Sequence, residues 1–227
     1  MTRPISPYHA PGFYEAELAH GRHRDIVGGR WDETARIQMQ LLRDAGLGPH
    51  HRLLDIGCGS LRLGHRAVPY LDPGHYWGTD LSAALMRRGY DAELADKGRL
   101  PPGHLIEDAD FSFRGIPDTI DFALAFAVFT HLPAPYLARA LAQVRARFPA
   151  LNQFLFTVFL APDAATGGAP LRQLDGVVTH PDRAPYHLLA GDVLALCAAA
   201  GFSARQHGLR LPRGQVLFTA APEAVAA

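Results

Sequence analysis

The chain has little cysteine, no excess of either charge and no long apolar run. Its 227 residues include two cysteines, Cys58 and Cys197, which form no CxxC pair, so neither a disulfide framework nor a cysteine-based zinc site is expected. The 22 lysines and arginines balance 22 aspartates and glutamates, and this zero net charge argues against nucleic acid or an anionic membrane as a partner. No stretch approaches the roughly 20 apolar residues that span a bilayer, and the first residues lack the pattern of a secretory signal. These absences predict a cytoplasmic protein that does not bind membranes.

Apolar residues make up 48% of the chain, enough to form the core of one sizeable domain. From residue 52 onward, short apolar runs alternate with helical patterns. Strands are expected in 52–57, 75–80, 103–108, 121–129, 152–160, 204–210 and 215–221, and helices in 31–46, 61–71, 81–90, 134–148 and 191–202. The first five strands are apolar almost throughout, which is typical of strands buried on both faces of a parallel sheet. The sequence therefore predicts an α/β fold with a Rossmann-like, doubly wound, seven-stranded sheet, mostly parallel, whose C-terminal strand is antiparallel.

Composition also divides the chain. Residues 1–30 are irregular and rich in aromatic side chains and histidine, and we expect an N-terminal cap there. Residues 31–222 would form the main domain, and the Ala-rich residues 223–227 a frayed tail. Within the domain, the stretch 161–190 is rich in Pro, Gly, Asp and His and is longer than an ordinary connection, so it is interpreted as a lid or substrate loop.

Chemistry is concentrated where the expected strands end. The first strand runs into Gly57 and Gly59, and a Gly-x-Gly turn before a helix lets a nucleotide-type ligand approach the backbone. Asp55 precedes this turn, Asp80 ends the second strand and Asp108 ends the third, so they could accept from an ammonium, a ribose and an adenine amine, respectively. Each acid taken alone could instead cap a helix. Their shared position at strand ends favours a donor-rich, partly cationic ligand over a dinucleotide.

In these motifs the sequence resembles the class I methyltransferases that depend on S-adenosylmethionine (SAM). LLDIGCGSLRLG is similar to the family's first motif, YWGTDLS to its second, IEDADF to its third and FALAFAVFTHL to its fourth, over a region from Trp31 to Phe218. One departure is Leu61, which stands where the first motif commonly has its third glycine. The resemblance implies SAM as the cofactor and implies a set of cofactor-binding residues: Trp31, Asp55, Gly57, Cys58, Gly59, Asp80, Leu81, Asp108, Ala109 and Phe126.

The candidate catalytic residues follow from the reaction. In-line methyl transfer needs alignment of a nucleophile, and a histidine base helps when the nucleophile carries a proton. His131, directly after the fourth strand, is the first candidate, with a purely structural histidine as the alternative. Tyr186 and His187 lie in the long loop and would line the substrate pocket unless that loop is simply solvated. No histidine pair has a third ligand at a recognisable spacing, so no metal site is expected.

The sequence thus predicts a SAM-dependent methyltransferase acting on a small organic molecule, with no nucleic-acid partner. The small-molecule subgroup is indicated by the segment GGRWDETARIQMQLL, in which Trp31 would close over the methionine end of the cofactor or serve as a hydrophobic staple at a helix start. Three alternatives remain open: an enzyme that cyclises or cleaves SAM, an NAD(P)-dependent oxidoreductase, and a binding module without turnover. The oligomeric state is also open, with a homodimer among the options.

Overall fold

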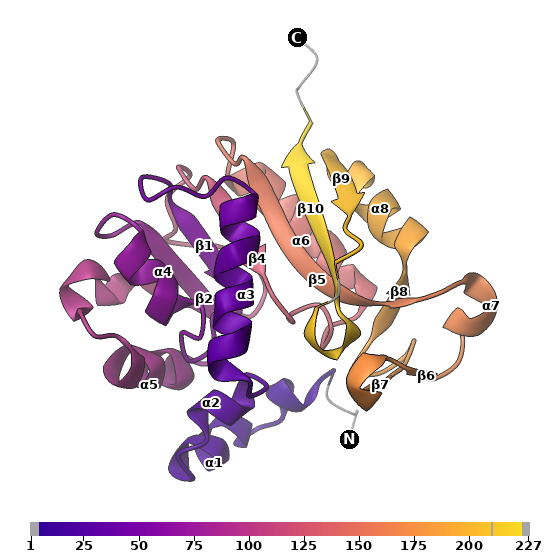
Figure 1. Ribbon diagram of the computed structural model, residues 1–227, viewed down its shortest axis with the longest axis horizontal. Coiled ribbons are helices and arrows are strands. Elements are labelled where there is room, and N and C mark those ends of the chain that lie inside the picture. The colour runs from indigo at the N-terminus through magenta and orange to yellow at the C-terminus, as the bar shows by residue number, and fades with distance from the viewer. Residues whose placement is uncertain (1–4, 210, 224–227) are drawn as a thin grey trace.

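The computed structural model describes residues 5–209 and 211–223 (Figure 1). The α-helices are α1 (Phe13–Ala19), α2 (His23–Ile26), α3 (Trp31–Asp44), α4 (Gly64–Tyr70), α5 (Ala83–Glu93), α6 (Ala134–Arg147), α7 (Ala164–Gly167) and α8 (Ala190–Ala199). The strands are β1 (Leu53–Ile56), β2 (Tyr76–Asp80), β3 (Leu105–Glu107), β4 (Phe122–Ala125), β5 (Gln153–Ala161), β6 (Leu171–Arg172), β7 (Val178–Thr179), β8 (His187–Leu189), β9 (Phe202–Gln206) and β10 (Val216–Pro222). Short 3-10 helices are η1 (Pro7–His9), η2 (Lys97–Arg99), η3 (Pro102–His104), η4 (Leu174–Gly176) and η5 (Pro212–Gly214).

A single mixed sheet organises this part of the chain. Its strand order is β3-β2-β1-β4-β5-β10-β9, and β8 adds an eighth strand by pairing with β5. Strands β1 to β5 run parallel to their neighbours, whereas β10 is antiparallel to both β5 and β9. The predicted Rossmann-like α/β fold, with its reversed C-terminal strand, is therefore confirmed.

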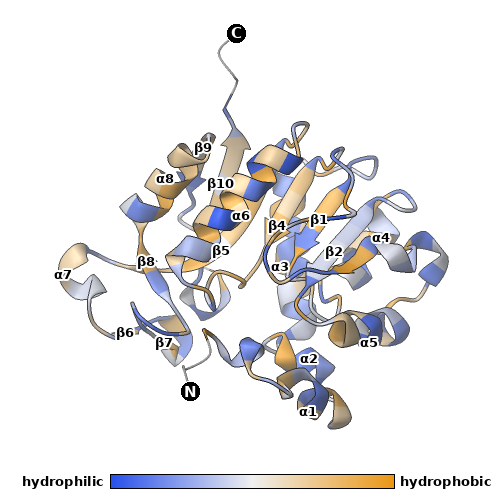
Figure 2. Cartoon of the chain, turned by 180° about the vertical axis from the view of Figure 1, so that it is seen from behind, coloured by the Kyte–Doolittle hydropathy of each residue, from blue (hydrophilic) through white to orange (hydrophobic). Residues whose placement is uncertain are grey.

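The core has two halves, one on each face of the sheet. Alternate residues of a strand point to opposite faces, so in β1 Leu53 packs with α3, α4 and α5, whereas Leu54 packs with α6 and α8. Figure 1 shows α3 in front of the sheet and α6 and α8 behind it. Figure 2, seen from behind, shows largely apolar strands, with polar patches on α6 and a mostly apolar α8. In the described chain, no helix combines the length and apolar character needed to cross a bilayer.

The segment 161–190, expected to be one long loop, contains regular structure. It holds α7, the hairpin of β6 and β7, and β8, whose residues His187 to Leu189 pair in parallel with Phe159 to Ala161 of β5. The amino-terminal stretch is also more regular than its composition indicates, because η1, α1 and α2 precede α3. Of the predicted frayed tail, residues 224–227 lie outside the described residues.

Both of these additions lie at the same edge of the sheet. The parallel strands β1, β2, β4 and β5 end at this edge, and the antiparallel β10 begins there, since Val216 pairs with Val158 near the end of β5. In Figure 1 the helices α1 and α2 lie below one half of this edge and the β6–β7 hairpin below the other. The carboxyl edge of the sheet, where α/β proteins bind ligands, is therefore covered from two sides.

Candidate active site

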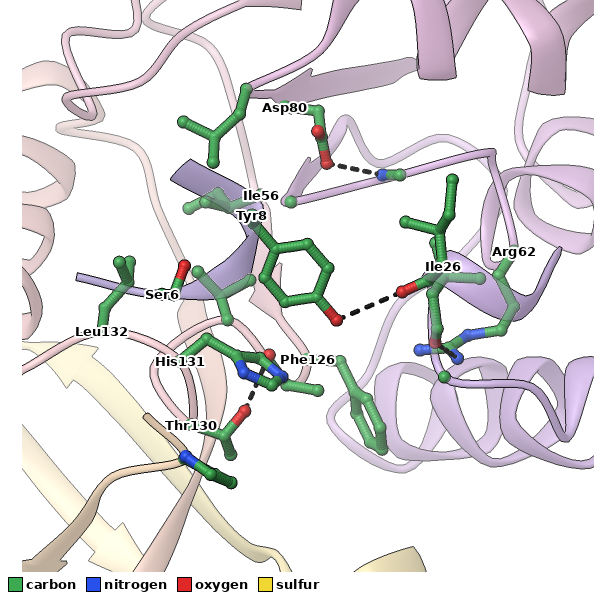
Figure 3. Close-up of a pocket in the computed structure, with 18 of the residues that line it drawn as sticks. Ser6, Tyr8, Ile26, Ile56, Arg62, Asp80, Phe126, Thr130, His131 and Leu132 are labelled. Atoms are coloured by element: carbon green, nitrogen blue, oxygen red, sulfur yellow. Dashed lines mark hydrogen bonds between the residues drawn. The ribbon is translucent and has the colours of Figure 1, made fainter. Parts of the chain in front are cut away.

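A cavity of about 220 Å³ lies at this edge, between the sheet and the amino-terminal helices. It extends from the ends of β1, β2 and β3, through the turn after β4, to the start of β10. Its charged lining residues include Arg30, Arg62, Asp80, Asp108 and Arg213, and aromatic residues come from several segments, among them Tyr8, Tyr14, Phe111, Phe126 and Phe159. Figure 3 shows Tyr8 in the middle of the cavity, between Asp80 and His131.

The loop after β1 forms one wall of this cavity and requires glycine at two positions. Gly57 and Gly59 have φ angles of 72° and 55°, in the left-handed region that favours glycine. A Cβ on Gly57 would lie 2.5 Å from Val128 and one on Gly59 would lie 2.4 Å from Val27, so no side chain fits at either position. Leu61 also has a positive φ of 64°, and its fully buried side chain, packed in the core, stabilises this turn without a third glycine.

Asp80 ends β2 and faces this loop. Its Oδ2 accepts from the backbone N–H of Gly59 at 2.9 Å (Figure 3). Its Oδ1 accepts from the backbone N–H of Ser82 at 3.2 Å. Burial raises the pKa of Asp80 to about 6, although these backbone N–H groups oppose the rise. A carboxylate accepts about four hydrogen bonds, so each oxygen of Asp80 can accept another one from a ligand.

The other two strand-end acids already have protein partners. Buried Asp55 accepts from the Tyr76 hydroxyl at 2.7 Å, and burial raises its pKa to about 7. The Asp108 carboxylate accepts four hydrogen bonds, from the backbone of Asp110, Ser112 and Phe113 and from the Ser112 hydroxyl, at 2.7 to 3.3 Å. Burial raises its pKa, but these hydrogen bonds outweigh burial and leave that pKa below its usual value. Of the two acids that line the cavity, Asp80 accepts two of these hydrogen bonds and Asp108 accepts four, so Asp80 has more acceptor capacity left for a ligand.

Arg62 brings a positive charge into the same region. Its side chain is 8% exposed, one of its terminal nitrogens donates to the Val27 carbonyl, and its Nε–H has no partner. No described carboxylate forms an ion pair with it, and burial lowers its pKa to about 10. A buried guanidinium with an unpartnered donor is costly, so this position favours an anionic ligand group.

His131 lies on the opposite wall, in the turn after β4. Thr157 accepts from the Ala127 backbone N–H at 2.8 Å, and the Thr130 hydroxyl donates to the Ala127 carbonyl at 2.8 Å, which fixes this turn. The His131 ring packs edge-on against Tyr8 at 4.8 Å between centroids. Burial, with a smaller contribution from Arg213, lowers the pKa of His131 to about 4. Its imidazole is therefore neutral at pH 7 and can accept a hydrogen bond, while burial disfavours its protonated form.

Comparison with known proteins shows which proteins share this fold. A family model described as a methyltransferase domain matches residues 54–148, from β1 to the residue after α6. SAM-dependent methyltransferases adopt this fold. The magnesium protoporphyrin IX methyltransferase ChlM of Synechocystis, with bound SAM, is 16% identical, with a TM-score of 0.63 over 96% of this chain and 94% of that one. The TehB-like SAM-dependent methyltransferase of Corynebacterium glutamicum is 16% identical, with a TM-score of 0.60 over 94% of this chain and 100% of that one. DesVI of Streptomyces venezuelae is 18% identical, with a TM-score of 0.60 over 89% of this chain and 98% of that one.

Residues 54–148 thus match a methyltransferase domain, and the chain has the fold of SAM-dependent methyltransferases. Of the site residues predicted from the sequence, the cavity is lined by Gly57, Gly59, Asp80, Leu81, Asp108, Ala109, Phe126 and His131. The structure brings these eight together from the ends of four neighbouring strands. The ChlM structures contain SAM or SAH.

The structure places the other five predicted residues away from the cavity lining. Asp55 contacts Tyr76, and Cys58 is buried beneath Gly78, whose added Cβ would lie 2.8 Å from its sulfur. Tyr186 donates from its hydroxyl to the Ile5 carbonyl at 3.1 Å. His187 is buried, with Nδ1 2.9 Å from the Thr179 hydroxyl and Nε2 2.9 Å from the Gly167 carbonyl. These two loop residues therefore pack the segment 161–190 against the domain.

Trp31 holds the amino-terminal helices in place. Its ring stacks on His65 of α4 at 5.4 Å, and the Arg24 guanidinium lies 5.0 Å from its centre. Arg24 also forms a two-pronged ion pair with Glu93 of α5, at 2.8 and 2.7 Å. Residues 5–30 are thus fastened to the helices that follow β1 and β2.

Further residues line the cavity besides those in the predicted set. The Tyr8 hydroxyl donates to the Ile26 carbonyl at 3.1 Å (Figure 3). Burial raises the pKa of Tyr14, and the nearby Asp80 carboxylate adds to this rise. Arg62 and Arg213 reach the cavity from the loop after β1 and from η5. The aromatic composition of residues 1–30 is the one signal that pointed toward such a lining.

Proposed function

We propose that this protein transfers the methyl group of SAM to a small organic molecule bound near His131. One observation carries the proposal: a single cavity joins the glycine loop and Asp80 to the neutral imidazole of His131. The cofactor and an acceptor can therefore meet in one enclosed space, where alignment alone can lower the barrier by roughly 7 to 11 kcal/mol. The domain boundaries at residues 30 and 222 belong to this proposal, with residues 5–30 as a cap over the cavity.

The cofactor half of the cavity fits SAM. Asp80 would accept the ribose hydroxyls with its remaining acceptor capacity, and Arg62 would pair its free Nε–H with the methionine carboxylate. Leu81, Phe126 and the backbone at Ala109 would enclose the adenine, because the Asp108 carboxylate already accepts four hydrogen bonds. The bound cofactor supplies an electrophilic methyl group on a sulfonium. The protein supplies binding, alignment and exclusion of water.

The other half fits an acceptor. His131 would accept the proton of the attacking hydroxyl or amine, and the turn held by Thr157 and Thr130 would keep its ring in position. Tyr8 packs on the same ring and limits its movement.

Product analysis tests the proposed reaction. The protein is incubated with methyl-labelled SAM and a fractionated small-molecule extract, and we expect S-adenosylhomocysteine (SAH) together with label in one acceptor fraction. Methylthioadenosine as the main product would instead identify an enzyme that cleaves or cyclises SAM. Binding of NAD(P)H without binding of SAM would contradict the proposal.

We predict that His131→Ala lowers turnover much more than cofactor affinity. Loss of a general base typically lowers the rate by about 100-fold or more, whereas the proposed cofactor contacts lie on the opposite wall. Turnover is measured with the labelled acceptor fraction, and SAH affinity by calorimetry. Because the pKa of His131 is about 4, its protonation should not reduce activity between pH 8 and about pH 5.

His9→Ala is a matched control, since His9 also lines the cavity but comes from the cap. It should retain most of the turnover. Equal activity of His131→Ala and the wild type would give His131 a purely structural role.

A further inference from the structure

The acceptor half of the cavity has one unneutralised cation at its mouth. Arg213 lies in η5, directly before β10 and therefore above the end of β5, and its guanidinium approaches Gly28, as that of Arg62 also does. One terminal nitrogen of its guanidinium donates to the Gly28 carbonyl at 2.8 Å. No described carboxylate lies within ion-pair distance of this guanidinium. The cation is held in place without a counter-charge.

Of the two exposed arginines at the mouth, Arg30 and Arg213, only Arg213 forms no ion pair with a described carboxylate. Arg30, also at the mouth, is neutralised by Asp175 at 3.1 Å. The same Asp175 carboxylate accepts from the Arg213 backbone N–H at 3.2 Å, and this contact fixes the backbone of Arg213 but leaves its side chain free of an ion pair. Arg213 has a φ of 64°, which is unfavourable for a residue with a side chain and is typical of functional positions.

The surroundings of Arg213 define the rest of a ligand. The guanidinium is close enough to His131 to contribute to lowering the pKa of that histidine. The lining between the mouth and the sheet is apolar and is contributed by Leu132, Phe159, Val177, Pro185 and Pro212. A ligand that fills this volume needs an apolar body. A charged group is least costly at the mouth, where Arg213 is still exposed to solvent.

We propose that the methyl acceptor is an apolar carboxylic acid whose carboxylate pairs with Arg213. The proposal rests on the proposed function, because it names the substrate class of the same cavity. One terminal nitrogen of the guanidinium is bound to the Gly28 carbonyl. The remaining N–H groups can bind a planar group with two oxygens, such as a carboxylate. The carboxylate anchors the acceptor, and its apolar body reaches toward His131.

Benzoate and benzamide, which share a shape and differ in charge, serve as probes. Their affinities are measured for the SAH-loaded wild type, Arg213→Gln, Arg213→Lys and a control, Arg205→Gln, in which an exposed arginine of β9 is changed. We expect the wild type to prefer benzoate by roughly fivefold to tenfold, as for a partly exposed charge-assisted pair. The preference should disappear in Arg213→Gln, decrease in Arg213→Lys and persist in Arg205→Gln, while SAH affinity stays within about twofold.

The same titrations identify failure. Equal binding of the two probes to the wild type, or no binding of benzoate at millimolar concentration, would overturn the inference. If Arg213→Gln loses affinity for both probes to the same extent, Arg213 only holds Gly28 in place. If it loses affinity for SAH alone, Arg213 contacts the cofactor. If the wild type fails to bind SAH, the proposed function is contradicted, and the benzoate preference of the unloaded protein decides the role of Arg213 by itself.

Discussion

Replacing Asp80 with alanine is expected to weaken SAM binding by roughly 10- to 150-fold. This range corresponds to about 1.5 to 3 kcal/mol for hydrogen bonds to a charged group. Alanine removes both the proposed acceptor for the ribose and the partner of the Gly59 N–H in the glycine loop. Asp80→Asn is the matched variant, because it keeps one oxygen and should lose less affinity. Calorimetry with SAH measures the difference, and unchanged affinity in Asp80→Ala would remove this residue from the site.

The pH dependence of binding gives a second view of the same carboxylate. Its pKa in the free protein is about 6. Hydroxyl donors from the ligand favour the ionised form, so the pKa should be lower in the complex. The dissociation constant of SAH should therefore be constant above pH 6 and rise as the pH falls through about 6, by up to about tenfold per pH unit. Asp80→Asn, which cannot ionise, should lack this rise, and a rise of equal size in both proteins would assign it to another group.

Replacing Arg62 with glutamine is expected to abolish discrimination between SAM and decarboxylated SAM. The wild type should prefer SAM by roughly 10- to 100-fold, because the buried guanidinium has a free donor for the methionine carboxylate. Arg62→Gln should bind SAM more weakly and should bind the two compounds about equally. Competitive calorimetry with both compounds measures this preference.

Arg87→Gln is the control, since Arg87 is an arginine of α5 whose side chain is 85% exposed. It should retain the full preference for SAM. Arg62 also donates to the Val27 carbonyl. If Arg62→Gln binds both compounds more weakly by the same factor, Arg62 only holds the cap in place and does not bind the methionine carboxylate.

Sequence patterns predicted the sheet well because burial dominates it. Strands β1, β4 and β5 are apolar on both faces, so their position in the centre of the sheet follows from composition alone. β8 was missed because three residues in a Pro- and Gly-rich segment carry little periodicity, and their pairing with β5 is purely tertiary. The fourth strand was predicted too long, since the chain turns at Ala127 with a φ of 62°.

The part of the site at the ends of β1 and β2 was predictable from the sequence. Gly57, Gly59 and Asp80 belong to the ends of adjacent strands, and their meeting follows from parallel order. The roles of Asp55 and Asp108 depend on which donors lie nearby, and the strand-end pattern does not reveal these donors. Arg62 and Arg213 are 151 positions apart in sequence, and terminal nitrogens of both lie within 4 Å of the point that a Cβ on Gly28 would occupy. This convergence exists only in the folded chain.

A crystal structure with SAH tests the central claim, the placement of the cofactor, most directly. We predict the ribose hydroxyls on Asp80, the amino-acid carboxylate on Arg62 and the sulfur facing His131. SAH bound outside this cavity, or bound within it without contacting Asp80, would contradict the proposed site.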